Sequence, residues 1–115
     1  MKLPTDFAGA IDWAKAPVST RKGDPGVATA RTRQVGDIQL RVVTYSPGYI
    51  SDHWCPKGHI MFVLDGAAII ELKNGKKYSL EKGMSYYTGD DDDAPHRLIT
   101  KSGASVFIVD SVPAG

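Results

Sequence analysis

The sequence predicts an all-β protein, a single-domain antiparallel barrel or sandwich preceded by an irregular N-terminal arm. Three observations carry this prediction. A chain of 115 residues is long enough for one domain with its own core. From residue 28 onward, short segments of alternating or continuous apolar residues are separated by Gly, Pro and Asn. About eight or nine short strands of this kind favour an antiparallel barrel or sandwich.

Residues 1–27 form the predicted arm and residues 28–115 the predicted domain. One short helix is expected in the arm behind the candidate N-cap Asp6, from apolar residues at helical spacing: Phe7, Ala10, Ile11 and Ala14. Pro17 would end this helix. Residues 19–26 contain two glycines, a proline and an aspartate, which predicts a loop.

The strands of the predicted domain follow in order. Ile38, Leu40 and Val42 alternate with other residues and predict a half-buried strand that ends near residue 45. Residues 60–64 and 67–70 are apolar on both faces, which predicts two strands covered by the core on one side and by a partner or second subunit on the other. Asn74-Gly75 predicts a hairpin turn. Further strands are expected at 84–88, 96–100 and 105–110.

Composition and charge exclude several classes of protein. Hydrophobic residues make up 42% and charged residues 23%, as in soluble globular proteins, and a net charge of +1 gives no signal for nucleic acid or an anionic membrane. One cysteine cannot form an internal disulfide. The first residues lack the apolar stretch of a signal peptide, so we expect a cytoplasmic protein. The acidic run 90–93 lacks the spacing of a calcium loop and is expected to be solvated.

All three histidines and the only cysteine lie between positions 53 and 96. If residues 51–55 form a strand, His53 and Cys55 share one face, while His59 and His96 each begin a further predicted strand. Imidazole nitrogen and thiolate sulfur suit Zn²⁺, Cu or Fe and suit Mg²⁺ or Ca²⁺ badly. Taken singly, a cysteine is most often a small buried residue and a histidine a hydrogen-bonded one. Their joint placement favours a shared metal site.

This spacing resembles the two metal-binding motifs of the cupin superfamily of small β-barrels. The first family motif has Gly, His, His, Glu and Gly at fixed spacing, and the matching residues here are Gly48, His53, Cys55, His59 and Gly66. Cys55 therefore stands where the second histidine is expected, and His59 where the glutamate is expected. Gly83 and His96 match the ends of the second motif, with two extra residues between them. The resemblance covers roughly residues 28–110, and the residues around His53 are most similar to an uncharacterised subgroup labelled by an Asp-His-Cys-Trp motif.

The resemblance implies a jelly-roll-like antiparallel barrel with one divalent transition metal ion held by His53, Cys55, His59 and His96. Taken together, the two departures give three imidazoles and one thiolate where the family has three imidazoles and one carboxylate, which keeps the charge that is offered to the metal but makes the ligand set softer. Zn²⁺ is therefore preferred, with Fe, Ni or Cu as alternatives. The resemblance and the doubly apolar strands at 60–70 both suggest a homodimer.

A substrate pocket is expected beside the metal, with four candidate lining residues: Arg41, Tyr45, Tyr87 and Arg97. An arginine could bind a substrate carboxylate bidentately, but outward-facing positions fit the alternation equally well. Three functions remain open. The protein is a metalloenzyme acting on a small organic substrate at the barrel mouth, a non-catalytic module whose metal anchors a small-molecule ligand, or a barrel with a purely structural metal. No nucleic-acid or membrane partner is expected.

Overall fold

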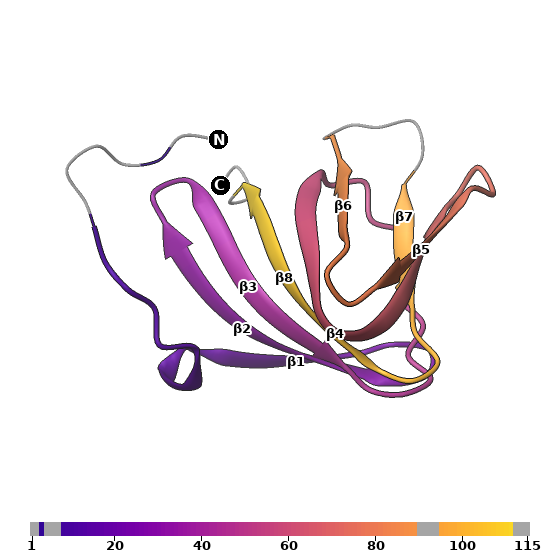
Figure 1. Ribbon diagram of the computed structural model, residues 1–115, viewed down its shortest axis with the longest axis horizontal. Helices are drawn as coiled ribbons and strands as arrows, with labels where there is room; N and C mark the ends of the chain where they lie inside the picture. The colour runs from indigo at the N-terminus through magenta and orange to yellow at the C-terminus, as the bar shows by residue number, and fades with distance from the viewer. Residues whose placement is uncertain (1–2, 4–7, 90–94, 112–115) are drawn as a thin grey trace.

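The computed structural model describes residue 3, residues 8–89 and residues 95–111 and shows an antiparallel β-structure (Figure 1). Within these residues the elements are the 3₁₀ helix η1 (Trp13–Lys15) and the strands β1 (Val18–Lys22), β2 (Val27–Val35), β3 (Ile38–Tyr45), β4 (His59–Leu72), β5 (Lys77–Glu81), β6 (Ser85–Thr88), β7 (His96–Ile99) and β8 (Ala104–Ser111). The predicted all-β fold is confirmed. No helix in the described part of the chain is long and apolar enough to cross a membrane.

The strands form two antiparallel sheets that share β4. In the first sheet the order is β1-β2-β3-β8-β4-β6, and in the second β5 and β7 flank the other half of β4. Figure 1 shows the two sheets meeting along β4, with β5, β6 and β7 on one side and the long strands β2, β3 and β8 on the other. This arrangement leaves the inner faces of both sheets turned toward one another.

The two strands predicted at 60–64 and 67–70 are one continuous strand. β4 changes its register to β8 between Val63 and Asp65, and Gly66 then adopts a φ of 75°. A positive φ is accessible to glycine without steric strain, so the chain turns from the first sheet into the second without ending the strand. A Cβ atom on Gly66 would collide with the backbone oxygen of Gly103. The bend that joins the sheets therefore depends on this glycine.

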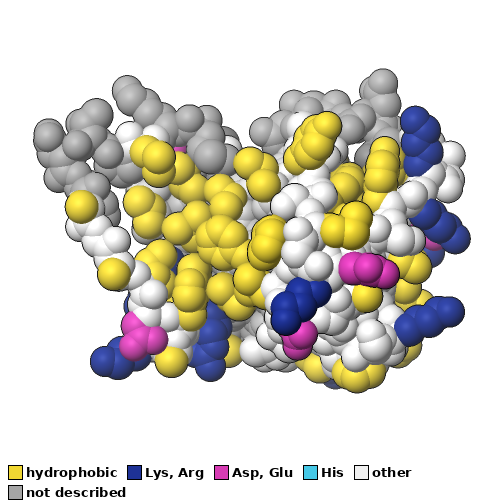
Figure 2. Space-filling model, viewed as in Figure 1, with side chains coloured by type: hydrophobic (Ala, Val, Ile, Leu, Met, Phe, Trp, Pro, Cys, Tyr) yellow, Lys and Arg dark blue, Asp and Glu magenta, His cyan; other side chains and the backbone are white. Residues whose placement is uncertain are grey.

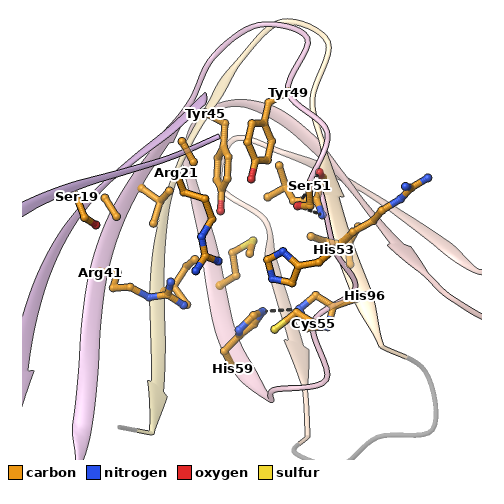
Figure 3. Close-up of a pocket in the computed structure, with 18 of the residues that line it drawn as sticks. Ser19, Arg21, Arg41, Tyr45, Tyr49, Ser51, His53, Cys55, His59 and His96 are labelled. Atoms are coloured by element: carbon orange, nitrogen blue, oxygen red, sulfur yellow. Dashed lines mark hydrogen bonds between the residues drawn. The ribbon is translucent and has the colours of Figure 1, made fainter. Parts of the chain in front are cut away.

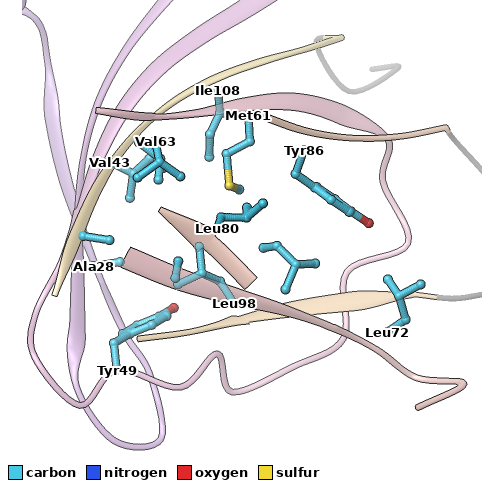
Figure 4. Close-up of a cluster of buried hydrophobic side chains, with 14 residues drawn as sticks. Ala28, Val43, Tyr49, Met61, Val63, Leu72, Leu80, Tyr86, Leu98 and Ile108 are labelled. Carbon is cyan, nitrogen blue, oxygen red and sulfur yellow. The ribbon is translucent and has the colours of Figure 1, made fainter. Parts of the chain in front are cut away.

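The hydrophobic core lies between the two sheets (Figure 4). Val63 and Ile70 from β4 and Val106 from β8 have no exposed surface, and Leu80 and Leu98 close the core from β5 and β7. Side chains along β8 alternate between buried and partly exposed positions, as expected for a strand with one face on the core. The core fills one end of the space between the sheets and leaves the other end for polar residues.

The outer face of the first sheet is also apolar. The register of β3, β8 and β4 aligns two rows of side chains across it: Leu40, Val109 and Ile60, and Val42, Phe107 and Phe62. Figure 2 shows hydrophobic side chains gathered over these three strands. Ile60 and Phe62 are 50% and 39% exposed. Over residues 60–64, β4 is therefore apolar on both faces, as the sequence indicates, because Met61 and Val63 are buried on its inner face. A second copy of the chain over this outer apolar face stays a prediction.

The N-terminal region differs from the prediction. Residues 8–12 are not helical, and only η1 forms a turn, with the Asp12 side chain accepting a hydrogen bond from the Ala14 N–H. The loop predicted at 19–26 is wrong over its first part, because β1 pairs with β2 from Val18 to Lys22. The sheet thus begins before the predicted domain boundary at residue 28. Asp6, Phe7 and the acidic run 90–93 lie outside the described residues.

The remaining elements follow the sequence closely. The alternation over 38–45 is confirmed as β3, and the strands β6, β7 and β8 lie close to the predicted ranges. Asn74-Gly75 turns β4 into β5, with Gly75 at a φ of 98° and the Asn74 side chain accepting a hydrogen bond from the Lys76 N–H. These elements place the first residue of β4 and the first residue of β7 at the same end of the molecule.

Candidate functional site

A cavity of about 300 Å³ opens between the sheets at the end that the core leaves free (Figure 3). One wall consists of every second residue of β1, β2 and β3: Ser19, Arg21, Ala28, Ala30, Thr32, Gln39, Arg41, Val43 and Tyr45. The other wall contains His53, Cys55, His59 and His96. The four residues predicted as metal ligands therefore line one cavity, opposite a wall that carries arginine and hydroxyl groups.

His59 and His96 are the predicted ligands that meet most closely. Their Nε2 atoms lie 2.9 Å apart, and their side chains are buried with residue exposures of 9% and 4%. The two rings stand edge to face, with centroids 4.6 Å apart and an interplanar angle of 82°. One Nε2–H donates to the lone pair of the other nitrogen, so at least one imidazole is neutral. The donor atoms of two buried imidazoles thus converge at the cavity wall.

Cys55 reaches the site by pairing with the backbone of His96. The Cys55 N–H donates to the His96 carbonyl at 2.7 Å, and the His96 N–H donates to the Cys55 carbonyl at 3.0 Å. Residues 51–55 do not form a strand, which is the condition for placing His53 and Cys55 on one face: residues 52 and 53 form a bend, and within 51–55 only Cys55 makes a β-bridge. This single bridge is enough to bring the thiol beside the histidine pair in the cavity wall.

His53 lies at the exposed rim of the site. Its side chain is 52% exposed, and its Nδ1 atom lies 2.7 Å from Asp52 Oδ1. This hydrogen bond holds the pKa of the Asp52 carboxyl below its usual value. Figure 3 shows the imidazole of His53 extending into the cavity. His53 is therefore held in the cavity wall by a neighbouring carboxylate.

The donor atoms present suit a transition metal, although the described residues contain no cluster of three His, Cys, Asp or Glu side chains close enough to hold one. Two imidazole nitrogens that each bind one ion at about 2.0–2.1 Å lie about 2.9 Å apart at a right angle and about 3.3 Å apart at the tetrahedral angle. The 2.9 Å separation of the His59 and His96 nitrogens matches one edge of such a shell. The thiol of Cys55 adds the soft donor that Zn²⁺, Fe and Cu accept. The ligand set of four stays a prediction.

A buried carboxylate that the sequence analysis missed lies behind His59. The Asp110 side chain is 1% exposed, and its Oδ2 atom accepts a hydrogen bond from Arg41 Nη2 at 2.8 Å. The same oxygen lies 4.0 Å from His59 Nδ1 and 3.9 Å from Lys57 Nζ. The signal in the sequence is a charged residue at an inward position of the alternating strand β8. His59 therefore faces His96 with one ring nitrogen and Asp110 with the other.

Three of the four predicted substrate residues line the cavity, and Tyr87 does not. Arg41, Tyr45 and Arg97 are part of the wall, whereas Tyr87 is 81% exposed on β6. Its neighbour Tyr86 takes the buried position instead, because successive strand residues point to opposite faces. The assignment of Tyr87 to the pocket is therefore wrong.

The three remaining residues differ in what they offer to a ligand. Arg97 donates to Glu71 Oε1 at 2.8 Å and covers the Trp54 ring at 4.6 Å from its centroid, so its charge is already balanced. Tyr45 packs against Tyr49 with ring centroids 4.8 Å apart. Burial raises the pKa of Tyr45 well above its usual value, so its hydroxyl stays protonated and can donate a hydrogen bond. The sequence analysis missed Ser19 and Arg21, because it assigned both to a loop.

Neither a comparison with protein-family models nor one with curated proteins finds a match. Solved structures do match the fold. The EutQ protein of Clostridium difficile superposes with a TM-score of 0.72 at 16% identity, covering 92% of this chain and 88% of that one. A sugar phosphate isomerase from a cupin superfamily of Silicibacter pomeroyi gives 0.71 at 15% identity, with coverage of 90% and 75%. Ectoine synthase from P. lautus gives 0.62 at 19% identity, with coverage of 76% and 65%. The chain has the fold of the cupin superfamily.

Proposed function

We propose that this protein is a small metal-binding cupin that acts on a small organic substrate held in the cavity. The observation that carries the proposal is the convergence of the His59 and His96 Nε2 atoms at 2.9 Å in the cavity wall. Burying imidazole rings is unfavourable unless their nitrogens are bonded, so two buried rings that share one contact point form a specific arrangement. Cys55 and His53 line the same cavity and supply the further donors.

The proposed ligands are His59 and His96, completed by Cys55 and His53. Zn²⁺ is the preferred ion, with Fe, Ni or Cu as alternatives, because nitrogen and sulfur donors are soft. Bound at this site, such an ion supplies Lewis-acid activation, or redox chemistry in the case of Fe or Cu.

The chain's own residues would prepare His59 for this role. For Nε2 of His59 to bind an ion, the ring proton must sit on Nδ1, which faces the Asp110 carboxylate at 4.0 Å. Arg41 holds that carboxylate in place through its hydrogen bond to Oδ2. Asp110, held by Arg41, would therefore favour a proton on Nδ1 of His59 through its charge, while the cavity wall keeps the ring away from bulk water.

The proposal also includes catalysis. The cavity is of the size of small-molecule sites. Proteins of this fold include enzymes, namely a sugar phosphate isomerase, an ectoine synthase and DMSP lyases. Fold likeness alone does not name a reaction, so catalysis by this chain rests on the site.

A non-catalytic module in which the metal anchors a small ligand is the alternative. The donor count favours it, since four protein ligands fill a tetrahedral shell and leave no position for a substrate. The half-exposed position of His53 favours the enzyme instead, because a ligand at the solvent-exposed rim is the one that water or a substrate can replace. Turnover of a small molecule that copurifies with the chain supports the enzyme, and tight retention without turnover supports the module.

Metal content tests the site itself. Elemental analysis of the purified chain should find one transition metal ion, with strong loss in His96→Ala and weaker loss in Cys55→Ser. Tyr87→Ala serves as the control, because Tyr87 is 81% exposed and outside the cavity. Equal metal content in all variants would refute the proposed ligands. An apo-protein with an unchanged melting temperature would exclude a purely structural metal.

A further inference from the structure

The lining of the cavity is cationic. Among the described residues that line the cavity there are three arginines and no aspartate or glutamate. Two of these charges are balanced by carboxylates outside the lining, since Arg41 pairs with Asp110 and Arg97 with Glu71. The side chain of Arg21 makes no hydrogen bond or ion pair with any residue that the structure describes. Arg21 is therefore the one arginine of the cavity lining without an ion-pair partner among the described residues, and the exposed Asp52 carboxylate acts on its charge only at longer range.

The strand register explains how Arg21 reaches the cavity from the edge of the sheet. On β1, Ser19 and Arg21 line the cavity, while Thr20 and Lys22 take the alternate positions outside it. Arg21 pairs with Ala28 on β2, and Ala28 pairs with Tyr45 on β3. Because Ala28 carries only a methyl group, the long Arg21 side chain can cross β2 toward Tyr45.

The polar groups of this wall gather at one place. Figure 3 shows the guanidinium groups of Arg21 and Arg41 extending into the cavity near the Tyr45 hydroxyl, with His53, His96 and Cys55 on the opposite side. The positive charges of Arg41 and Arg21 both act on the ionisation of Tyr45, which places them near its hydroxyl. Toward an anion, the two guanidinium groups and the protonated hydroxyl all act as hydrogen-bond donors.

We propose that the cavity binds a small organic acid, whose carboxylate is held by Arg21 with Arg41 and the Tyr45 hydroxyl as further donors. A carboxylate carries one charge and fits the single arginine at this wall that has no ion-pair partner among the described residues, whereas a phosphate monoester carries about 1.5 to 2 negative charges at neutral pH. The planar guanidinium group can accept the carboxylate with two parallel hydrogen bonds.

The position of the arginine wall also orients the ligand. With the carboxylate at Arg21, the rest of the molecule extends toward His59 and His96 across a cavity of about 300 Å³. Only the placement of the ligand's other end, beside His59 and His96, rests on the proposed function. The substrate class is thus a small acid that carries its reacting group away from its carboxylate.

Binding of butyrate and of its neutral analogue butyramide tests the proposal. Titrations of the 115-residue chain, as purified and after chelation, are followed by amide chemical shifts in NMR spectra. Arg21→Gln removes the proposed contact, and Lys22→Gln is the matched control that removes one positive charge from the adjacent position of the same strand. A thermal melt of each variant verifies folding, which an exposed residue of an edge strand should not disturb.

We expect butyrate to shift resonances of residues that line the cavity and butyramide to leave them unchanged. Arg21→Gln should weaken butyrate binding roughly tenfold or more, because an ionic hydrogen bond is lost, while Lys22→Gln should match the wild type. Equal binding of butyrate and butyramide, equal effects of the two variants, or tighter Arg21-dependent binding of inorganic phosphate than of butyrate would overturn the proposal.

The outcome separates this inference from the proposed metal function. A chain that holds no metal but binds butyrate through Arg21 supports the carboxylate site and contradicts the metal site. A chain that loses its metal in His96→Ala but shows no Arg21-dependent butyrate binding contradicts the carboxylate site and supports the metal site. Each result therefore bears on one proposal independently of the other.

Discussion

Replacing Asp110 by asparagine should expose the energetic role of the buried charge pair in the wall of the barrel. The Asp110 side chain is 1% exposed and pairs with Arg41 at 2.8 Å, while the Arg41 side chain is 27% exposed. Removing one partner of a fully buried ion pair destabilises a protein by about 3–5 kcal/mol, because the other charge is left uncompensated. Solvent reaches part of Arg41, so we expect a loss of about 2–3 kcal/mol in the free energy of unfolding.

Urea unfolding at neutral pH measures this loss in a double-mutant cycle with Arg41→Met. The double variant should be more stable than Asp110→Asn alone, because the Arg41 charge is removed together with its partner and only the partly exposed Lys57 remains nearby. Glu71→Gln is the control at a more exposed pair, where Glu71 is 16% exposed and meets Arg97 at 2.8 Å, and it should lose only about 1 kcal/mol. A loss below about 1 kcal/mol in Asp110→Asn, or a double variant no more stable than it, would refute the reasoning.

Three further predictions concern other parts of the fold. Burial raises the pKa of Tyr45, so the unfolded chain releases this proton first, and the free energy of unfolding should fall as pH rises above about 10. In urea unfolding at stepped pH, Tyr45→Phe should lessen this fall, whereas the exposed control Tyr87→Phe should not, and identical profiles would contradict the prediction. Gly66→Ala should lower the free energy of unfolding by about 2 kcal/mol or more, through its positive φ and a collision with the Gly103 backbone. Gly75→Ala, where φ is also positive but the space is open, should lower it by about 1 kcal/mol in the same assay, and equal losses would show that the collision is unimportant. We propose that the outer apolar face joins two copies of the chain, so sedimentation should show a dimer that Phe62→Glu dissociates, and a monomeric wild type would reject it.

Hydrophobic alternation predicts strands in this chain but not the face that each strand turns inward. In β3 the apolar residues Leu40 and Val42 lie on the outer face, while Gln39 and Arg41 line the cavity. The cavity reverses the usual arrangement of an apolar inner face and a polar outer face, because its wall carries polar groups while the outer face of the same sheet is apolar. The pattern is the same in both cases, so the sequence alone could identify the strand and not its orientation.

Strand β1 escaped prediction for a related reason. Its inward residues are Ser19 and Arg21, which carry no hydrophobic signal, and every residue of the strand is exposed. Its register with β2 is set by long-range pairing that no local pattern records. The cysteine and histidines were easier to identify, because a scarce residue type that recurs within a short stretch is informative before any strand is assigned. Their meeting depends on the bend at Gly66 and on the single bridge of Cys55 to His96, which spacing does not reveal.

The histidine pair joins the two sheets at their open end. His59 pairs with Thr88 in the first sheet, and His96 pairs with Leu72 in the second, so the 2.9 Å contact between their nitrogens spans both. The two residues are 37 positions apart in the chain and pair with different sheets, so the contact forms only when the two sheets are packed together. The association of the two sheets and the binding of a ligand to the histidine pair are consequently linked equilibria. Any ligand that bridges both rings holds the sheets together and raises the apparent stability of the closed state by RT ln(1 + [L]/Kd).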